Sequence, residues 1–336
     1  MLVSVGEAQE APAAGPYKVL KTAKVGGEGG FDYIFADVKG RRLYIPRGGP
    51  TGRLTVFDLD RLEPAGEIAN VSAGGATVDP KSHHGFSTTK PITMWDASTL
   101  KVIKTIDVDG RPDGILFDPY NERVWVLSHQ PPYATVIDAK EGTVVGTLDL
   151  GGGPEQAVSD GKGTVYINIS DKANIAVVDA KKMTVTAHYD VSSKGTGGSG
   201  LALDAKNHVL FAYYRQPLPV VVIVNAKNGD IITTLPTGRG VDTVAFNPAT
   251  MEAISAEGGG TMTFIKENSP TSFAVEQTLT TMPWAKTLAL DTKTNHVLTM
   301  TAEFGPPPAD AQPRPAWRPA RGPMIAGSFT ILMVGK

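Results

Sequence analysis

Short apolar runs that end in aspartate or asparagine recur along this chain at nearly constant intervals. Successive members of this set, the repeat markers, lie 39 to 44 residues apart, and they are Asp37, Asp79, Asp118, Asp160, Asp204, Asn247 and Asp291. A period near 42 residues is typical of a propeller in which each copy folds into one four-stranded sheet. The seven copies therefore predict an all-β, seven-bladed β-propeller built from antiparallel strands.

A second polar position divides each of the first five copies. It is occupied by Asp58, Asp96, Asp138, Asp179 and Asn225, and each follows an apolar, β-branched run and precedes a turn and another such run. Alternating apolar and polar positions, with Gly, Asn and Asp at the turns, indicate short antiparallel strands. No stretch of about 12 residues carries a helical period with capping residues. The pattern thus predicts four strands for each copy.

The last copy is one strand short. Only one β-like run, at 328–336, follows residues 284–303, whereas a β-like run at 17–25 precedes the first copy. We expect this N-terminal strand to join the last blade, because that pairing closes the ring and removes exposed strand edges. The predicted domain covers residues 16–336, with blades over 27–68, 69–106, 107–148, 149–189, 190–235, 236–279 and 280–336, the last completed by 17–25.

One copy carries a family pattern. Residues 150–185 combine a Gly-Pro start, an Asp-Gly turn, a Tyr-Ile-Asn-Ile run and a Val-Val-Asp end. This segment resembles a YVTN-type β-propeller repeat, and residues 31–48 and 110–129 are similar to it. The resemblance implies a propeller of a family whose members are mostly exported bacterial proteins, and related seven-bladed propellers include lactonases. Both a binding protein and an enzyme are therefore compatible with it.

The amino-acid composition excludes several classes of partner and of chemistry. The chain has 336 residues, 41% of them hydrophobic, with a net charge of −2 and a pI near 6.3, so it lacks the basic character of nucleic-acid-binding proteins. The absence of cysteine excludes disulfides, thiolate metal ligands and a cysteine nucleophile. No apolar run approaches the roughly 18 residues of a membrane span. We expect a monomer.

The N-terminal residues 1–15 contain small side chains but no basic start and no complete apolar core. We interpret this segment as a disordered N-terminus or as the remnant of an export signal. The expected location is periplasmic or secreted.

Acidic residues recur where each copy is expected to meet the central channel. Five residues before the repeat markers stand the ring residues Asp32, Gly74, Asp113, Glu155, Ser199, Asp242 and Lys286. Because the innermost strands of a propeller begin beside the channel on one face, these side chains should surround its mouth. Crowded carboxylates raise one another's pKa or require a cation, and a ring of oxygen ligands suits Ca²⁺ or another hard divalent ion. Alternatively, they cap backbone N–H groups or pair with arginines.

These considerations define the candidate site residues. The four ring carboxylates Asp32, Asp113, Glu155 and Asp242 are candidate ligands for a metal ion, and with Lys286 they are candidates for binding a small-molecule or peptide ligand. Loops on the same face add the candidate ligand-binding residues Arg47, Arg111, Arg215, Arg239, Glu257 and Glu303. Carboxylate and imidazole groups on one rim can act as an acid–base pair, with guanidinium groups as an anion clamp. Glu155 and His129 are the candidate catalytic residues.

The link between residues 303 and 328 breaks the repeat. Every other connection between second and third strands is only a few residues long, but this insertion contains seven prolines together with Arg314, Arg318, Arg321 and Trp317. Its prolines, without alternation, exclude a regular strand or helix. We predict a partial lid over the mouth, in which at least one arginine reaches the acidic ring. Trp317 is expected to shield the entrance and is a further candidate ligand-binding residue.

Three functional hypotheses follow. The first is an exported propeller that binds a small molecule, a metal ion or a peptide at an acidic, arginine-flanked channel mouth. The second is a hydrolase of lactones, activated esters or phosphotriesters that uses the same face, with or without a central divalent cation. The third is a protein-interaction scaffold in which the acidic residues hold no ligand.

Overall fold

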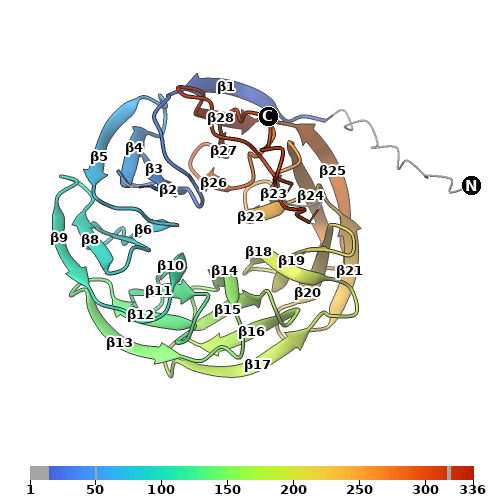
Figure 1. The fold of residues 1–336 in the computed structure, drawn as a ribbon. Coiled ribbons are helices and arrows are strands. Elements are labelled where there is room, and N and C mark those ends of the chain that lie inside the picture. The colour runs from blue at the N-terminus through green and yellow to red at the C-terminus, as the bar shows by residue number, and fades with distance from the viewer. Residues whose placement is uncertain (1–14, 50, 316–318) are drawn as a thin grey trace, which may run out of the picture.

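The computed structural model describes residues 15–49, 51–315 and 319–336, and all regular elements in these ranges are strands. Seven four-stranded antiparallel sheets stand around a central axis, as Figure 1 shows, so the chain is an all-β, seven-bladed propeller. The predicted fold class is confirmed. The predicted disordered N-terminus or export-signal remnant covers residues 1–15, and of these 1–14 fall outside the described residues.

The first four blades are each continuous in sequence. Blade one consists of β2 (Phe35–Asp37), β3 (Arg42–Arg47), β4 (Arg53–Asp58) and β5 (Pro64–Ala69). Blade two consists of β6 (Ala76–Val78), β7 (His84–Ser87), β8 (Ile92–Asp96) and β9 (Val102–Ile106). Blade three consists of β10 (Pro112–Asp118), β11 (Arg123–Ser128), β12 (Ala134–Asp138) and β13 (Thr143–Leu148). Blade four consists of β14 (Pro154–Ser159), β15 (Thr164–Ile169), β16 (Asn174–Asp179) and β17 (Thr184–Asp190).

Blades five and six are also continuous in sequence, whereas the last blade combines strands from both ends of the chain. Blade five consists of β18 (Thr196–Asp204), β19 (Val209–Gln216), β20 (Val220–Asn225) and β21 (Ile231–Pro236). Blade six consists of β22 (Val241–Asn247), β23 (Glu252–Glu257), β24 (Thr261–Ser269) and β25 (Ser272–Thr280). Blade seven consists of β26 (Leu288–Asp291), β27 (His296–Thr301), β28 (Thr330–Gly335) and β1 (Lys18–Lys24).

The N-terminal strand closes the ring from the outside. β1 pairs antiparallel with β28 and is the outermost strand of blade seven. Just before it, the Tyr17 ring stacks on Phe264 of blade six with centroids 3.6 Å apart. The Tyr17 backbone also exchanges two hydrogen bonds with the side chain of Gln277. The N-terminal segment therefore joins blade seven to blade six, as the predicted closure requires.

The repeat markers are turn residues. The Oδ1 atom of each marker accepts a hydrogen bond from a backbone N–H two or three residues later, with donor–acceptor distances from 2.7 to 3.2 Å. Aspartate and asparagine stabilise turns by bonding their own backbone in this way. Every blade needs the same turn between its first and second strands, and this local requirement explains the period in the sequence.

The hydrophobic core lies between neighbouring blades. Between blades one and two, for example, Tyr44 and Val56 belong to the same buried cluster as Val78 and Trp95. The two faces of each blade are covered by the blades beside it, so the middle strands carry nearly continuous apolar runs. This packing fixes where the innermost strands begin around the channel.

Candidate functional site

The innermost strands β2, β6, β10, β14, β18, β22 and β26 surround the channel, as Figure 1 shows. The ring residues precede or begin these strands, and contacts connect them around the channel. The Nζ atom of Lys286 binds the carboxylates of both Asp32 and Asp242, and Ser199 Oγ donates to the backbone oxygen of Asp242 at 2.8 Å. The structure therefore brings equivalent positions of separate copies into one site.

One half of this ring, the paired half, contains its own cations. Lys286 Nζ donates a hydrogen bond to Asp32 Oδ1 at 2.8 Å and another to Asp242 Oδ2. Arg215 donates from Nη2 to Asp242 Oδ1 at 2.8 Å and to Ser199 Oγ at 2.6 Å. The side chains of Arg215 and Asp242 are each only 11% exposed. Charges shielded from water in this way need close partners, and here the protein supplies them.

The other half, the open half, consists of Asp113, His129 and Glu155. His129 Nε2 lies 2.9 Å from Asp113 Oδ2. One ligand atom from each of the three side chains lies within 4.8 Å of the other two. Among the described residues, none donates a hydrogen bond to the Glu155 carboxylate or forms an ion pair with it. The open half therefore presents a carboxyl group that is available to a ligand.

Burial controls the protonation of this site. It raises the pKa of Glu155 to about 7; Asp242 and Asp113 add to the increase, and Arg215 and His129 oppose it. The hydrogen bond to Asp113 raises the pKa of the His129 imidazole. The open half thus places a carboxyl group that exchanges its proton near neutral pH beside an imidazole whose protonated form is favoured.

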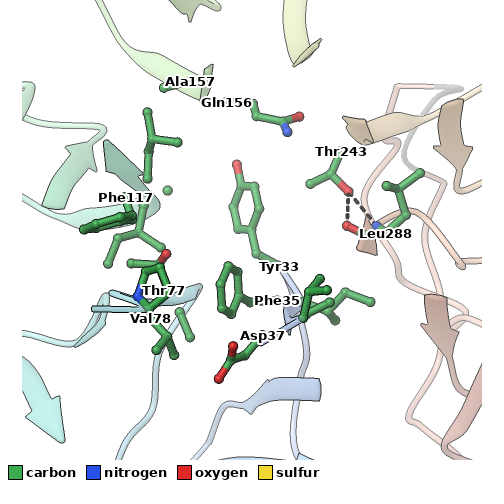
Figure 2. Close-up of a pocket in the computed structure, with 18 of the residues that line it drawn as sticks. Tyr33, Phe35, Asp37, Thr77, Val78, Phe117, Gln156, Ala157, Thr243 and Leu288 are labelled. Atoms are coloured by element: carbon green, nitrogen blue, oxygen red, sulfur yellow. Dashed lines mark hydrogen bonds between the residues drawn. The ribbon is translucent and has the colours of Figure 1, made fainter. Parts of the chain in front are cut away.

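A cavity of about 580 Å³ extends from the site into the channel. Glu155 belongs to its lining, and Figure 2 shows the Tyr33 ring standing in the cavity with its hydroxyl directed toward Gln156. Burial and then the surrounding carboxylates raise the pKa of Tyr33 well above its ordinary value, so the phenol stays protonated. Apolar side chains such as Phe35 and Phe117 form much of the remaining wall. The cavity therefore runs from a polar, acidic end at Glu155, between apolar walls, to Asp37 and Lys39 at the other end of the first blade's inner strand.

Tyr33 and Gln156 are residues that sequence reasoning missed. Gln156 reaches from blade four to blade six. There its Nε2 donates a hydrogen bond to the backbone oxygen of Val244 at 2.9 Å, and its Oε1 accepts one from the backbone N–H of Val244 at 3.1 Å. The position after each ring residue holds glycine or threonine in five of the seven copies, and Tyr33 and Gln156 are the two exceptions. This break in a pattern of small residues is the signal that identifies them.

Among the rim arginines, Arg215 is the one that binds a ring carboxylate within the described residues. Arg111 and Arg239 are exposed. The charge of Arg111 opposes protonation of His129, which places it beside the open half. Arg47 instead lies against Phe329 and under the loop at 26–30.

The two predicted acidic rim residues have other surroundings. Glu257 is fully buried, burial raises its pKa, and it accepts hydrogen bonds from the hydroxyl groups of Thr237, Ser255 and Thr261. This environment matches the alternative in which a carboxylate satisfies internal donors. Glu303 is exposed, and its carboxylate lies 3.9 Å from Lys24 Nζ of β1. In the described structure neither residue contacts the acidic ring.

The proline-rich insertion folds back on itself beside the ring. Phe304 and Met324 form an isolated β-bridge between its two ends. Arg321 lies over the rings of Phe304 and Trp284, with Cζ 4.1 and 5.1 Å from their centroids. Trp284 lies two residues before Lys286, the blade-seven ring residue, so this part of the insertion lies near the mouth. The predicted contact of Trp317 falls outside the described residues, and the lid stays a prediction.

The structure also changes the set of possible metal ligands. Asp32 and Asp242 hold Lys286, so two of the four predicted carboxylate ligands are already paired. The side chains that remain close together are Asp113, His129 and Glu155. A mixed imidazole–carboxylate set suits Zn²⁺ or another transition metal better than Ca²⁺, which prefers oxygen ligands alone.

Solved structures of other proteins share this fold. No protein-family model matches the chain, and no curated protein matches it in sequence. A chain from the crystal structure of a mitotic checkpoint complex is similar, with a TM-score of 0.73 and 10% identity over 89% of this chain and 94% of that one. A chain of Kuenenia stuttgartiensis hydrazine synthase has a TM-score of 0.69 and 14% identity over 81% of this chain and 92% of that one. Identities this low show a shared fold only.

None of the described residues belongs to a helix with the length and apolar character that a membrane crossing needs.

Proposed function

We propose that this propeller binds a small ligand with a cationic group at the mouth of its channel. The observation that carries the proposal is the open half of the ring. There, Glu155 has no hydrogen-bond or ion-pair partner among the described residues, and it lies within 4.8 Å of the Asp113–His129 pair. The paired half already holds two cations of the protein. A cation from a ligand would stabilise the ionised form of Glu155 in the same way.

The cavity supports a small molecule as the ligand. Its volume of about 580 Å³ falls within the range of small-molecule pockets, roughly 300–1,000 Å³. Glu155 would bind the charged head, and the Tyr33 hydroxyl offers a polar group in the same cavity. Apolar walls further along the channel suit a compact, uncharged body. The favoured ligand is therefore an amine with a small apolar part.

We further propose that the chain is an exported YVTN-type propeller. The repeat at 150–185 supports membership of that family, and the family resemblance in turn supports export. Fractionation of cells that express the protein tests the location. Recovery of the protein in the cytoplasmic fraction alone would contradict export.

Calorimetric titration tests the proposed ligand class. The probes are small quaternary amines, with neutral and carboxylate analogues of the same size. We expect the amines to bind about tenfold more tightly at pH 8 than at pH 6, because a group with a pKa of about 7 ionises between these values. Glu155→Gln should remove this pH dependence. Glu141→Gln is the matched control, because the Glu141 side chain is 63% exposed. Equal binding of the neutral analogues would contradict the proposal.

A hydrolase is the second candidate, and the Asp113–His129 pair beside Glu155 is the observation that favours it. Imidazole and carboxyl groups at this spacing can act as acid and base, and the three side chains can hold one divalent cation. The test uses a lactone, an aryl ester and a phosphotriester, each with added Zn²⁺ and with a chelator. Turnover that is lost in Glu155→Gln and His129→Gln, and kept in Glu141→Gln, supports catalysis. Failure to turn over any of these substrates argues against it.

A further inference from the structure

Tyr33 projects into the channel from a layer of residues next to the ring. This layer, the inner tier, consists of the residues that directly follow the ring residues: Tyr33, Gly75, Gly114, Gln156, Gly200, Thr243 and Thr287. Five of its seven members are glycine or threonine, which carry a short side chain or none. Tyr33 is partly exposed, and Figure 2 shows its ring in the middle of the cavity. A small molecule in the cavity would therefore meet this phenol.

The other polar side chains of the inner tier already have partners within the protein. Thr287 Oγ1 donates a hydrogen bond to a backbone oxygen at 2.8 Å, and Thr243 Oγ1 accepts one from a backbone N–H at 2.6 Å. The amide of Gln156 is held by the two backbone hydrogen bonds described above. Tyr33 differs, because its hydroxyl has no hydrogen-bond partner among the described residues. The inner tier therefore presents one phenol that is available to a ligand.

Contacts with blade two fix the base of the Tyr33 side chain. The backbone N–H of Tyr33 donates a hydrogen bond to the backbone oxygen of Gly74 at 3.0 Å. A Cβ atom at Gly75 would lie only 3.5 Å from the Cβ of Tyr33, so blade two packs closely against this residue. A donor that the fold already holds in place costs little ordering when a ligand binds.

The charges around Tyr33 determine which acceptor suits it. Burial and then the nearby carboxylates, that of Glu155 first and that of Asp113 second, raise the pKa of Tyr33 well above its ordinary value. The phenol therefore stays protonated and acts as a hydrogen-bond donor at neutral pH. The same carboxylates would repel an anionic acceptor. An uncharged oxygen atom, such as that of a carbonyl or ether group, is the favoured partner.

We propose that Tyr33 donates a hydrogen bond to an uncharged oxygen atom of the ligand, so that the ligand is an amine with a carbonyl or ether group. This inference rests on the proposed function, in which Glu155 binds the cationic end of the same molecule. Tyr33 and Glu155 both line the one cavity, so a single small ligand can reach both. The apolar walls between the ends of the cavity favour an apolar link between the two groups of the ligand. Amino acids are disfavoured because they carry a carboxylate.

Calorimetric titration at pH 8 with pentyltrimethylammonium, its ketone analogue and its carboxylate analogue tests this role. The wild-type protein should bind the ketone about tenfold more tightly than the alkyl compound, as expected for one additional hydrogen bond. It should bind the carboxylate analogue no more tightly than the alkyl compound. Tyr33→Phe should remove the preference for the ketone and keep the affinity for the alkyl compound, because only the hydroxyl group is lost. The control is Tyr120→Phe, which removes the hydroxyl of a tyrosine that is 43% exposed in the turn after β10.

The outcomes separate the role of Tyr33 from the proposed function. Glu155→Gln should weaken the binding of the alkyl and ketone compounds alike and keep the preference between them. Amines that bind through Glu155 without a preference for the ketone would overturn the inference and leave the amine site standing. A preference that survives in Tyr33→Phe, or tighter binding of the carboxylate than of the ketone, would also overturn it. If none of the amines binds, both proposals fail.

A folding defect in Tyr33→Phe would still leave a decision. If circular dichroism shows that this variant does not fold, the preference of the wild-type protein decides alone. A tenfold preference for the ketone then supports the hydrogen bond, and equal affinities for the ketone and alkyl compounds overturn it.

Discussion

Replacing Glu155 by glutamine should stabilise the protein at alkaline pH and change its stability little at pH 5. Burial raises the pKa of Glu155 from 4.5 to about 7. The folded protein therefore binds this proton more tightly than the unfolded chain does. A group of this kind contributes stability while it is protonated, and that contribution is lost as the pH rises through 7. Glutamine resembles the protonated form at every pH and avoids this loss.

The size of the effect follows from the two pKa values. The difference between 4.5 and about 7 corresponds to about 3 kcal/mol in the free energy of unfolding. At pH 8 the Glu155→Gln variant should therefore be more stable than wild type by about 3 kcal/mol. At pH 5 the difference should be less than about 1 kcal/mol, because Glu155 is then protonated in the folded protein and only partly ionised in the unfolded chain.

Urea unfolding at pH 5, 6, 7 and 8 measures this divergence. The control Glu141→Gln should stay within about 0.5 kcal/mol of wild type at each pH, since it removes an exposed carboxylate. A Glu155→Gln protein that is less stable than wild type at pH 8 would refute the reasoning. It would mean that the ionised carboxylate makes favourable contacts in the folded protein, as in the alternative in which ring carboxylates cap backbone donors.

Three further changes test the surroundings of the site. Lys286→Met leaves Asp32 and Asp242 without their shared lysine, and we expect a loss of about 2–4 kcal/mol in urea unfolding at pH 7; an unchanged midpoint would show that these pairs contribute nothing. Deletion of residues 1–24 uncovers the outer edge of blade seven and should cause aggregation on size-exclusion chromatography, so a monomer with an unchanged Tm would contradict the closure. Replacement of residues 306–325 by a short Gly-Ser link should preserve the Tm and alter amine affinity; unaltered affinity would contradict the lid.

Sequence alone was sufficient for the architecture and for the position of the ring. The repeat markers recur because every blade needs the same side-chain-stabilised turn, and this requirement is local. In a closed propeller, residues at the same position of each repeat lie at about the same distance from the central axis. For this reason Asp32, Asp113, Glu155 and Asp242 could be grouped from their spacing, and His129 could be expected near them. Proline and the lack of alternation likewise marked 304–327 as irregular.

Only the tertiary structure decided which of these groups are paired. Lys286 of blade seven binds Asp32 and Asp242, while Glu155 stays open, although the repeat treats all four positions alike. The same holds for Arg47, which spacing grouped with the mouth but which lies buried without an acidic partner in the described structure. The physical reason is that the repeat period of the sequence determines where each backbone position lies. Charge pairing depends instead on long side chains that reach between blades, and on how much hydration each charged group loses on burial.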